Sequence, residues 1–385
     1  KIQSGSIARR QNVVTLTKDG GQVPGKISDL AVFSGLERTD VETAEAGEIV
    51  ALSGLEEVNI GDTIADPTNP VALPRVTIDE PTVQMTFSVN NSPFAGRDGK
   101  YLTSRHLRER LFKELETNVS LRVQETDSAD RFLVAGRGEL HLGVLIEQMR
   151  REGYELQISQ PEVILHREGD TVTEPFEELT IQVPSEYQGP VIEEIGKRRG
   201  ELRHMKLVHS EGTASEMHIE YHIPTRGIIG LKNILLAKTR GTIILHHVFS
   251  GYAPADEKAL LVAPHGSLVA FEAGTSTAYA LFMTQERGEL FIGASVEVYQ
   301  GMVVGQNSRD EDLDVNVCKQ KQLSNMRAAG TDEALVLTPP REMSLEFAME
   351  YIGQDELVEV TPKYLRLRKR LLNPDDRRKA KKSSK

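Results

Sequence analysis

The chain has 385 residues, of which 39% are hydrophobic and 27% are charged, proportions typical of a folded protein with several domains. No apolar run approaches the ~18 residues of a membrane-spanning helix, no signal-peptide pattern opens the chain, and the single cysteine, Cys318, excludes internal disulfide bonds and indicates a reducing compartment. The net charge of −11 is uneven, because Lys363–Lys385 carries +9 and the preceding residues carry −20, which excludes a general nucleic-acid coat.

Residues 1–74 contain short alternating runs broken by glycine, such as VVTLTKDGGQV and VNIGDTIAD, and this spacing predicts a small β-barrel. The chain starts as strand material without Met, so we expect upstream residues to be missing. The stretch GGQVPGKIS (Gly20–Ser28) matches G-x-x-x-x-G-K of a phosphate-binding loop. Because Ile27 stands where that loop needs Ser or Thr, and a strand pattern follows instead of a helix, we predict a hairpin turn.

Residues 75–166 are predicted to form a strand, a helix, two strands, a helix and a final strand. The first helix, SRHLRERLFKELE, carries Leu107, Leu111 and Leu115 on one face, and the second, ELHLGVLIEQMRREG, ends at Gly153. This βαββαβ order is that of a ferredoxin-like domain.

Residues 167–252 repeat the βαββαβ order, with helices predicted in GPVIEEIGKRRG and GIIGLKNILLAKTRG. One of the strands contains HIEYH, in which His218, Glu220 and His222 share a face. Two histidines and a carboxylate can ligate a metal, which would indicate a metal-dependent hydrolase. Strand alternation alone also places polar residues on the solvated face of a sheet, and we favour that interpretation.

Residues 253–385 are predicted to form a β-rich C-terminal domain that ends in the basic tail. Strands are expected in SLVAFEAG, TAYALFMTQ, ELFIGASVEVYQGMVVGQ and EALVLTP, and again in DELVEVTP and YLRLRKRLL. One helix is expected, SLEFAMEYIG, with Ser344 as its N-cap and Gly353 as its stop. The tail beyond the last strand is either an RNA- or partner-binding segment or a disordered solubilising one.

The polar segment from Asn307 to Ala334 is the most suggestive of function. Long polar loops are usually functional or disordered, and cationic and amide side chains suit phosphates, riboses and base edges. An ordinary solvated loop is the alternative. No catalytic residue or metal ligand is assigned. The candidate RNA- or ribosome-binding residues are Arg309, Asn316, Lys319, Lys321, Asn325, Arg327, Arg366, Arg368, Lys369 and Arg370.

The chain resembles the BipA/TypA family of ribosome-associated translational GTPases over nearly its whole length. VNIGDTIAD resembles the second domain of translation factors, AGRGELHLGVLIEQMRREGYELQISQPEV is similar to the third domain of elongation factor G, and EPFEELTIQVPSEYQGPVIEEIGKRRGEL resembles the last domain of that factor. The motifs specific to the family are ERGELFIGASVEVYQGMVVG, LSNMRAAGTDEA and TPPREMSLEFAMEYIGQDELVEVTPKYLRLRKR.

The resemblance implies a multidomain α+β protein with a translation-factor barrel (1–74) whose first strand is missing, two ferredoxin-like domains (75–166 and 167–252) and a β-rich C-terminal domain (253–385). It implies ribosomal RNA and the acceptor end of A-site tRNA as partners, and a role in translation regulation, stress adaptation or ribosome assembly. We expect a monomer without membrane contact, in the cytoplasm or the chloroplast stroma. GTP and Mg²⁺ belong to the family's N-terminal GTPase domain, so we expect these residues to be non-catalytic. A stand-alone RNA-binding adaptor is the alternative.

Overall fold

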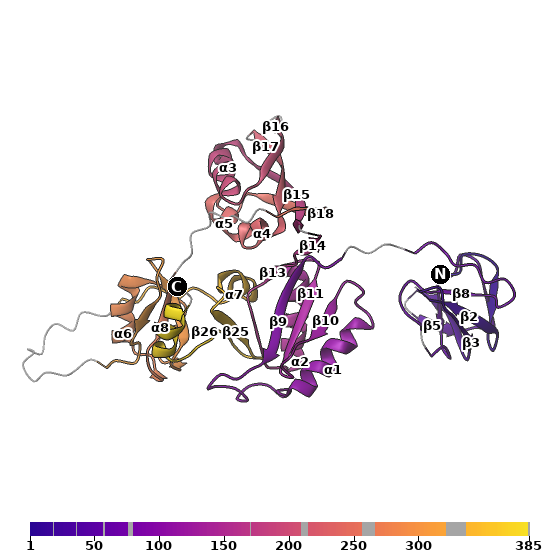
Figure 1. Ribbon diagram of the computed structural model, residues 1–385, viewed down its shortest axis with the longest axis horizontal. Helices are drawn as coiled ribbons and strands as arrows, with labels where there is room; N and C mark the ends of the chain where they lie inside the picture. Colours follow the sequence, from indigo (N-terminus) through magenta and orange to yellow (C-terminus); the bar gives the residue numbers. More distant parts are fainter. Residues whose placement is uncertain are drawn as a thin grey trace, which may run out of the picture. The chain divides into compact units, whose positions relative to one another are not determined.

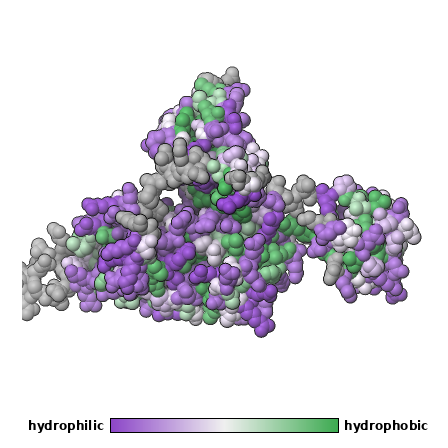
Figure 2. Space-filling model, viewed as in Figure 1, coloured by the Kyte–Doolittle hydropathy of each residue, from purple (hydrophilic) through white to green (hydrophobic). Residues whose placement is uncertain are grey.

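A computed structural model gives the arrangement of most of the chain (Figure 1). The chain divides into two compact units, Lys1–Asp79 with Lys113–Val119, and Glu80–Phe112 with Ser120–Lys385. No helix among the described residues is long and apolar enough to cross a bilayer. Hydrophilic side chains cover much of the visible surface in Figure 2. The residues that the structure describes are 1–17, 19–35, 37–56, 58–75, 80–169, 171–208, 215–255, 266–320 and 336–383.

The first unit is rich in short strands, as the sequence predicts. Its strands form three small sheets, in the orders β3-β2-β8, β5-β4-β7 and β1-β6. The segment Gly20–Ser28, which matches the phosphate-binding pattern, begins in the turn of the β2–β3 hairpin. In this turn Gly20 has a φ of 78°, and the Gly21 carbonyl accepts a hydrogen bond from the Thr17 backbone. The predicted hairpin turn is therefore confirmed. The strands are β1 (Ser6–Ala8), β2 (Asn12–Leu16), β3 (Gln22–Lys26), β4 (Leu30–Ser34), β5 (Glu37–Asp40), β6 (Thr43–Glu45), β7 (Val50–Leu52) and β8 (Thr63–Ala65).

The second unit begins with the first predicted βαββαβ motif. Its antiparallel order, β10-β11-β9-β12, is that of a ferredoxin-like sheet. Helix α2 ends at Gly153, whose φ of 99° is the left-handed conformation that glycine adopts at low cost. A two-residue strand, β13 (Glu162–Val163), also pairs with β9. The elements are β9 (Val83–Val89), α1 (Ser104–Leu115), β10 (Arg122–Glu125), β11 (Arg131–Gly136), α2 (Glu139–Glu152) and β12 (Leu156–Ile158).

The two faces of this sheet differ in chemistry. Helices α1 and α2 cover one face of the sheet (Figure 1). Met85 and Phe87 of β9 are buried on that face, whereas the alternation along the strand turns Thr86 and Ser88 to the opposite face. The same alternation puts Leu156 and Ile158 of β12 in the core and leaves the intervening residue on the polar face. We call this second side the open face.

The second βαββαβ motif has the same strand order, β18-β15-β17-β16. Its core includes Leu179, Ile195, Ile219 and Leu231. The helix predicted over 227–241 is divided in two, because Gly230 takes a left-handed φ of 69° between the two segments. The elements are β14 (His166–Glu168), β15 (Thr171–Pro184), η1 (Ser185–Tyr187), α3 (Gln188–Lys197), β16 (Glu201–Val208), β17 (Glu216–Pro224), α4 (Thr225–Ile228), α5 (Leu231–Lys238) and β18 (Ile244–Pro254).

The C-terminal region is less purely β than the sequence predicts. The stretch TAYALFMTQ, predicted as a strand, forms helix α6, and the Thr277 hydroxyl caps it by accepting a hydrogen bond from the backbone of Ala280. Helix α7 begins after its predicted cap, Ser344. The elements are β19 (Ser267–Ala270), β20 (Gly274–Thr275), α6 (Ala278–Thr284), η2 (Gln285–Arg287), β21 (Gly288–Leu290), β22 (Glu297–Val298), β23 (Met302–Asn307), β24 (Leu313–Val315), α7 (Leu345–Tyr351), β25 (Glu356–Val360), β26 (Leu365–Lys369) and α8 (Pro374–Ser383).

The first ferredoxin-like sheet continues directly into the C-terminal region. Strand β12 pairs antiparallel with β25, and the sheet then runs through β26, β23, β19 and β24. The residues predicted as two separate domains, 75–166 and 253–385, therefore share one sheet of eleven strands. The open face of the ferredoxin-like motif consequently borders the C-terminal strands.

Candidate RNA-binding surface

The structure describes the first part of the predicted polar loop. Arg309 and Lys319 are exposed, and neither forms an ion pair with another described residue. Their backbone carbonyls hold the loop to the domain, because Arg309 accepts a hydrogen bond from the Gly266 backbone and Lys319 accepts one from the Thr277 hydroxyl. The two cations thus project from an anchored backbone. The other predicted loop residues, Lys321, Asn325 and Arg327, lie outside the described residues.

Asn316, also predicted to bind RNA, is engaged within the protein. Its amide nitrogen donates to Glu272 at 2.7 Å, and its amide oxygen accepts from the Cys318 backbone at 2.9 Å. The side chain is exposed. These hydrogen bonds shape the turn that leads to Lys319, so Asn316 is suited to positioning that cation.

Three of the four predicted cations on β26 and just after it are held inside the domain. Arg366 is 12% exposed, pairs with Glu359 at 3.0 Å and lies over the Tyr364 ring, 4.5 Å from its centroid. Arg368 is 2% exposed and donates to Asn91 at 2.7 Å. Burial lowers the pKa of the Arg368 guanidinium. The structure therefore does not support RNA contacts by these side chains. Only Arg370 of the four is exposed.

Lys369 is the most enclosed of these cations. Its amine lies 2.8 Å from Asp312, 2.9 Å from Glu356 and 3.1 Å from Asp355, and its side chain is 3% exposed. Burial by itself would lower the pKa of Lys369, but the charges of Glu356 and Asp312 outweigh it and raise the pKa. The structure therefore gives no support to the prediction that Lys369 contacts RNA, because the side chain joins β26 to β25 and the loop before β24.

The basic tail forms a helix that is fastened to the domain. Arg377 of α8 contacts Asp314 and donates to the carbonyls of Leu371 and Leu372, the latter at 2.7 Å. Arg378 and Lys379 are exposed, at 69% and 81%. Of the two interpretations of the tail, the disordered one does not hold for residues 374–383, while the exposed cations still suit an anionic partner.

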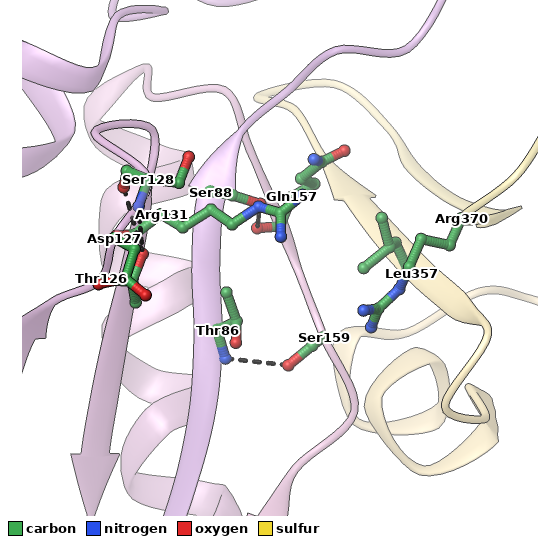
Figure 3. A pocket seen from close by; sticks show the side chains of 10 residues that line it. All are labelled: Thr86, Ser88, Thr126, Asp127, Ser128, Arg131, Gln157, Ser159, Leu357 and Arg370. Atoms are coloured by element: carbon green, nitrogen blue, oxygen red, sulfur yellow. Dashed lines mark hydrogen bonds between the residues drawn. The ribbon is translucent and has the colours of Figure 1, made fainter.

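The open face of the first ferredoxin-like sheet holds a pocket that sequence reasoning missed (Figure 3). Its volume is about 310 Å³. Arg131 of β11, Ser88 of β9 and Gln157 of β12 are register partners across the three strands, which puts them in one row. Arg370 reaches the same pocket from the opposite side, across Leu357 of β25. The pairing of β12 with β25 creates this site, and no local sequence pattern reports such a pairing.

The histidines of HIEYH do not form a metal centre. The His222 ring is stacked on Phe176 with centroids 4.7 Å apart and lies 3.2 Å from an Arg203 nitrogen. Residues of β17 alternate between buried and more exposed positions, as the solvated-face interpretation predicts. Within the described ranges, no group of three or more His, Cys, Asp or Glu residues could hold a metal ion. The structure therefore gives the hydrolase alternative no support.

Comparisons with known proteins match two parts of the chain to described families. Residues 265–374 match the TypA/BipA C-terminal domain, and residues 171–261 match the elongation factor G C-terminus. The second match covers most of the second ferredoxin-like motif, from β15 to the end of β18.

Curated relatives match almost the whole chain. A Synechocystis protein called large ribosomal subunit assembly factor BipA is 47% identical over 369 residues, which are 96% of this chain and 61% of that protein. Proteins of the same name from Salmonella typhimurium and Haemophilus influenzae are 46% and 48% identical, over 100% and 99% of this chain and 63% and 61% of their own lengths. The chain thus spans about three fifths of the length of these relatives.

Proposed function

We propose, from the premise that the chain belongs to the TypA/BipA family, that it binds the large ribosomal subunit and acts in ribosome assembly or in the regulation of translation. The observation that carries the proposal is the match of nearly the entire chain to relatives named large ribosomal subunit assembly factor. The bacterial cytoplasm or the chloroplast stroma is the compartment that this role requires. GTP and Mg²⁺ binding, which the resemblance implies for the family, is proposed for the part of the relatives that this chain does not cover.

Contact with RNA is proposed for local cations, because the body of the chain is acidic. Arg309 and Lys319 support this placement, since both are exposed, lie on a hydrogen-bonded backbone and have no carboxylate partner among the described residues. Lys321 and Arg327 follow in the same polar segment. We propose that this segment faces the acceptor end of A-site tRNA, as the family resemblance implies. Phosphate contacts of this kind depend strongly on salt.

Charge reversal in the loop tests the proposal. We expect Lys319→Glu, Lys321→Glu and Arg327→Glu together to weaken ribosome binding at least tenfold, or about 1.4 kcal/mol. Each lost phosphate contact should also lower the salt-dependence slope by ~0.7–0.9. Binding is measured by sedimentation with purified ribosomes at two salt concentrations, and the melting temperature of each variant is recorded.

The helix α8 provides a control with the same change in charge. Arg378→Glu, Lys379→Glu and Lys382→Glu alter three exposed cations, and Arg377, which fastens the helix, stays in place. We expect this variant to lose less affinity than the loop variant. If the loop variant sediments like the parent chain and the α8 variant does not, the tail is the anchor and the loop assignment is wrong.

A further inference from the structure

We propose that the open-face pocket binds a nucleoside phosphate unit, either as a free nucleotide or as one residue of an RNA strand. The site joins two arginines, Arg131 and Arg370, to a buried amide, Gln157, and nothing in the family matches assigns it a role. The proposal deepens the proposed function and rests on it only where the RNA strand is the source of the phosphate.

The two arginines form the anion-binding part of the site. Both are exposed, and neither side chain has a hydrogen-bond or ion-pair partner among the described residues. Neighbouring arginines differ, since Arg108 pairs with Glu125 and Arg122 pairs with Glu80. Figure 3 shows the two free guanidinium groups extending over the pocket from opposite sides. A guanidinium binds phosphate oxygens in a bidentate manner, which makes an unpaired pair of this kind well suited to a phosphate.

Gln157 gives a second observation that points to a ligand. It is 6% exposed, and its amide oxygen is buried without a hydrogen-bond partner. An unsatisfied buried acceptor costs about as much as a lost hydrogen bond, so such groups are rare in native structures unless they serve a function. The oxygen lacks a donor, and a ribose hydroxyl or a base amino group can supply one. Gln157 lies beside Ser88 in the row that ends at Arg131, and it is one of the residues that line the pocket.

The remaining lining residues fit one nucleotide. A volume of about 310 Å³ lies at the small end of the range for ligand pockets. The hydroxyls of Thr86 and Ser128 have no hydrogen bond to another described residue, and Leu357 adds an apolar surface for a sugar or base. Asp127 is the one carboxylate in the lining, so the two arginines leave the pocket with a formal charge of +1. The site is thus locally positive in an acidic chain.

Fluorescence anisotropy with the full 385-residue chain tests the site, using labelled hexauridylate as the probe. Guanosine 5′-monophosphate and inorganic phosphate are added as competitors, which separates a free nucleotide from an RNA strand as the source. The variants are Arg131→Gln with Arg370→Gln, and Gln157→Leu alone. Arg105→Gln is the matched control, because Arg105 lies on α1, on the covered side of the same sheet, and its side chain is 85% exposed.

We expect each pocket variant to weaken hexauridylate binding at least tenfold and Arg105→Gln to leave it unchanged. Competition by the mononucleotide at millimolar concentration supports the free-nucleotide source, and binding of hexauridylate without such competition supports the RNA source. Gln157→Leu should keep or raise the melting temperature, because it removes an unsatisfied buried amide. A purely structural role for Gln157 predicts the opposite pattern, a lower melting temperature with unchanged binding.

The site is overturned if the parent chain binds none of the three probes, or if the pocket variants bind like the parent. Sedimentation of the same proteins with ribosomes distinguishes a failure of the pocket proposal from a failure of the proposed function. A parent chain that sediments with ribosomes but binds no probe refutes the pocket alone. A parent chain that binds the probes through the pocket but does not sediment with ribosomes refutes the proposed function and leaves the free-nucleotide source.

Discussion

Replacing Lys369 by Met should lower the stability of the C-terminal domain without removing a contact to RNA. The amine is enclosed by Asp312, Glu356 and Asp355. Glu356 is the partner most affected, because its side chain is 4% exposed and, among the described residues, would keep hydrogen bonds only from the Ser267 hydroxyl and the Gly353 backbone. Methionine matches the length of the lysine stem, so the substitution removes the charge and leaves little empty space.

The size of the effect follows from burial. Removing one partner of a buried ion pair typically costs about 3–5 kcal/mol, because the other charge is left without compensation. Asp355, which is 57% exposed, adds at most about 1 kcal/mol. Burial by itself would raise the pKa of Asp312, but Lys369 outweighs it and holds the pKa below its ordinary value. The ion pair between Lys369 and Asp312 therefore stabilises the fold fully above the ordinary pKa of an aspartate. This stabilisation is lost as the pH falls through the lowered pKa of Asp312.

Urea unfolding followed by circular dichroism measures the change, since the chain has no tryptophan. With a cost of about 3–5 kcal/mol and a slope of about 1–3 kcal/mol per molar urea, the midpoint should fall by roughly 1–5 M. The control is Lys319→Met, which removes an exposed lysine without an ion pair among the described residues and should stay within about 0.5 kcal/mol of the parent. If Lys369→Met unfolds like the parent and loses ribosome affinity instead, Lys369 is an RNA ligand and the structural reasoning fails.

Three other predictions concern pH, nucleotide and the tail. Burial, and then repulsion by Glu350, raises the pKa of Glu139 to about 7, so the folded chain binds an extra proton and stability falls as the pH rises from about 4.5 to 7. Over this pH range the urea midpoint of Glu139→Gln should fall less than that of the parent chain. Equal dependence of the two midpoints on pH would contradict this prediction. Calorimetry should detect no micromolar GTP binding by the chain alone, because Lys26 lies on a hairpin strand; a micromolar affinity refutes it. Arg377→Gln should free α8 from Asp314 and speed tryptic cleavage there, as mass spectrometry can follow, whereas unchanged cleavage rates argue against this anchor.

The secondary structure of both ferredoxin-like motifs could be predicted because its signals are local. Helix α2 shows an apolar face with i, i+3 and i+4 spacing and ends at a glycine, and β17 alternates polar and apolar residues. Helix α6 was missed because AYALFMT is apolar on nearly every side and has no clear period. Its cap, Thr277, is the local signal that could have corrected the prediction.

The parts of the site that sequence reasoning missed depend on distant strand pairing. Alternation tells which residues of β12 share a face, but it does not tell that β25, about two hundred residues later, is the neighbouring strand. For the same reason the sequence predicts RNA contacts for the basic run on β26, whereas the sheet encloses Arg368 and Lys369. Arg370, directly after that strand, is the cation that the fold leaves exposed, and it borders the pocket.

Sedimentation of the unaltered chain with purified large and small ribosomal subunits tests the central claim most directly. We expect the chain to pellet with large subunits and to dissociate as salt rises from about 50 to 200 mM, because a few phosphate contacts govern the affinity. Small subunits should retain much less of the chain. Failure to pellet with large subunits at the lower salt concentration, or equal retention by both subunits, would contradict the assignment of these residues to binding of the large subunit.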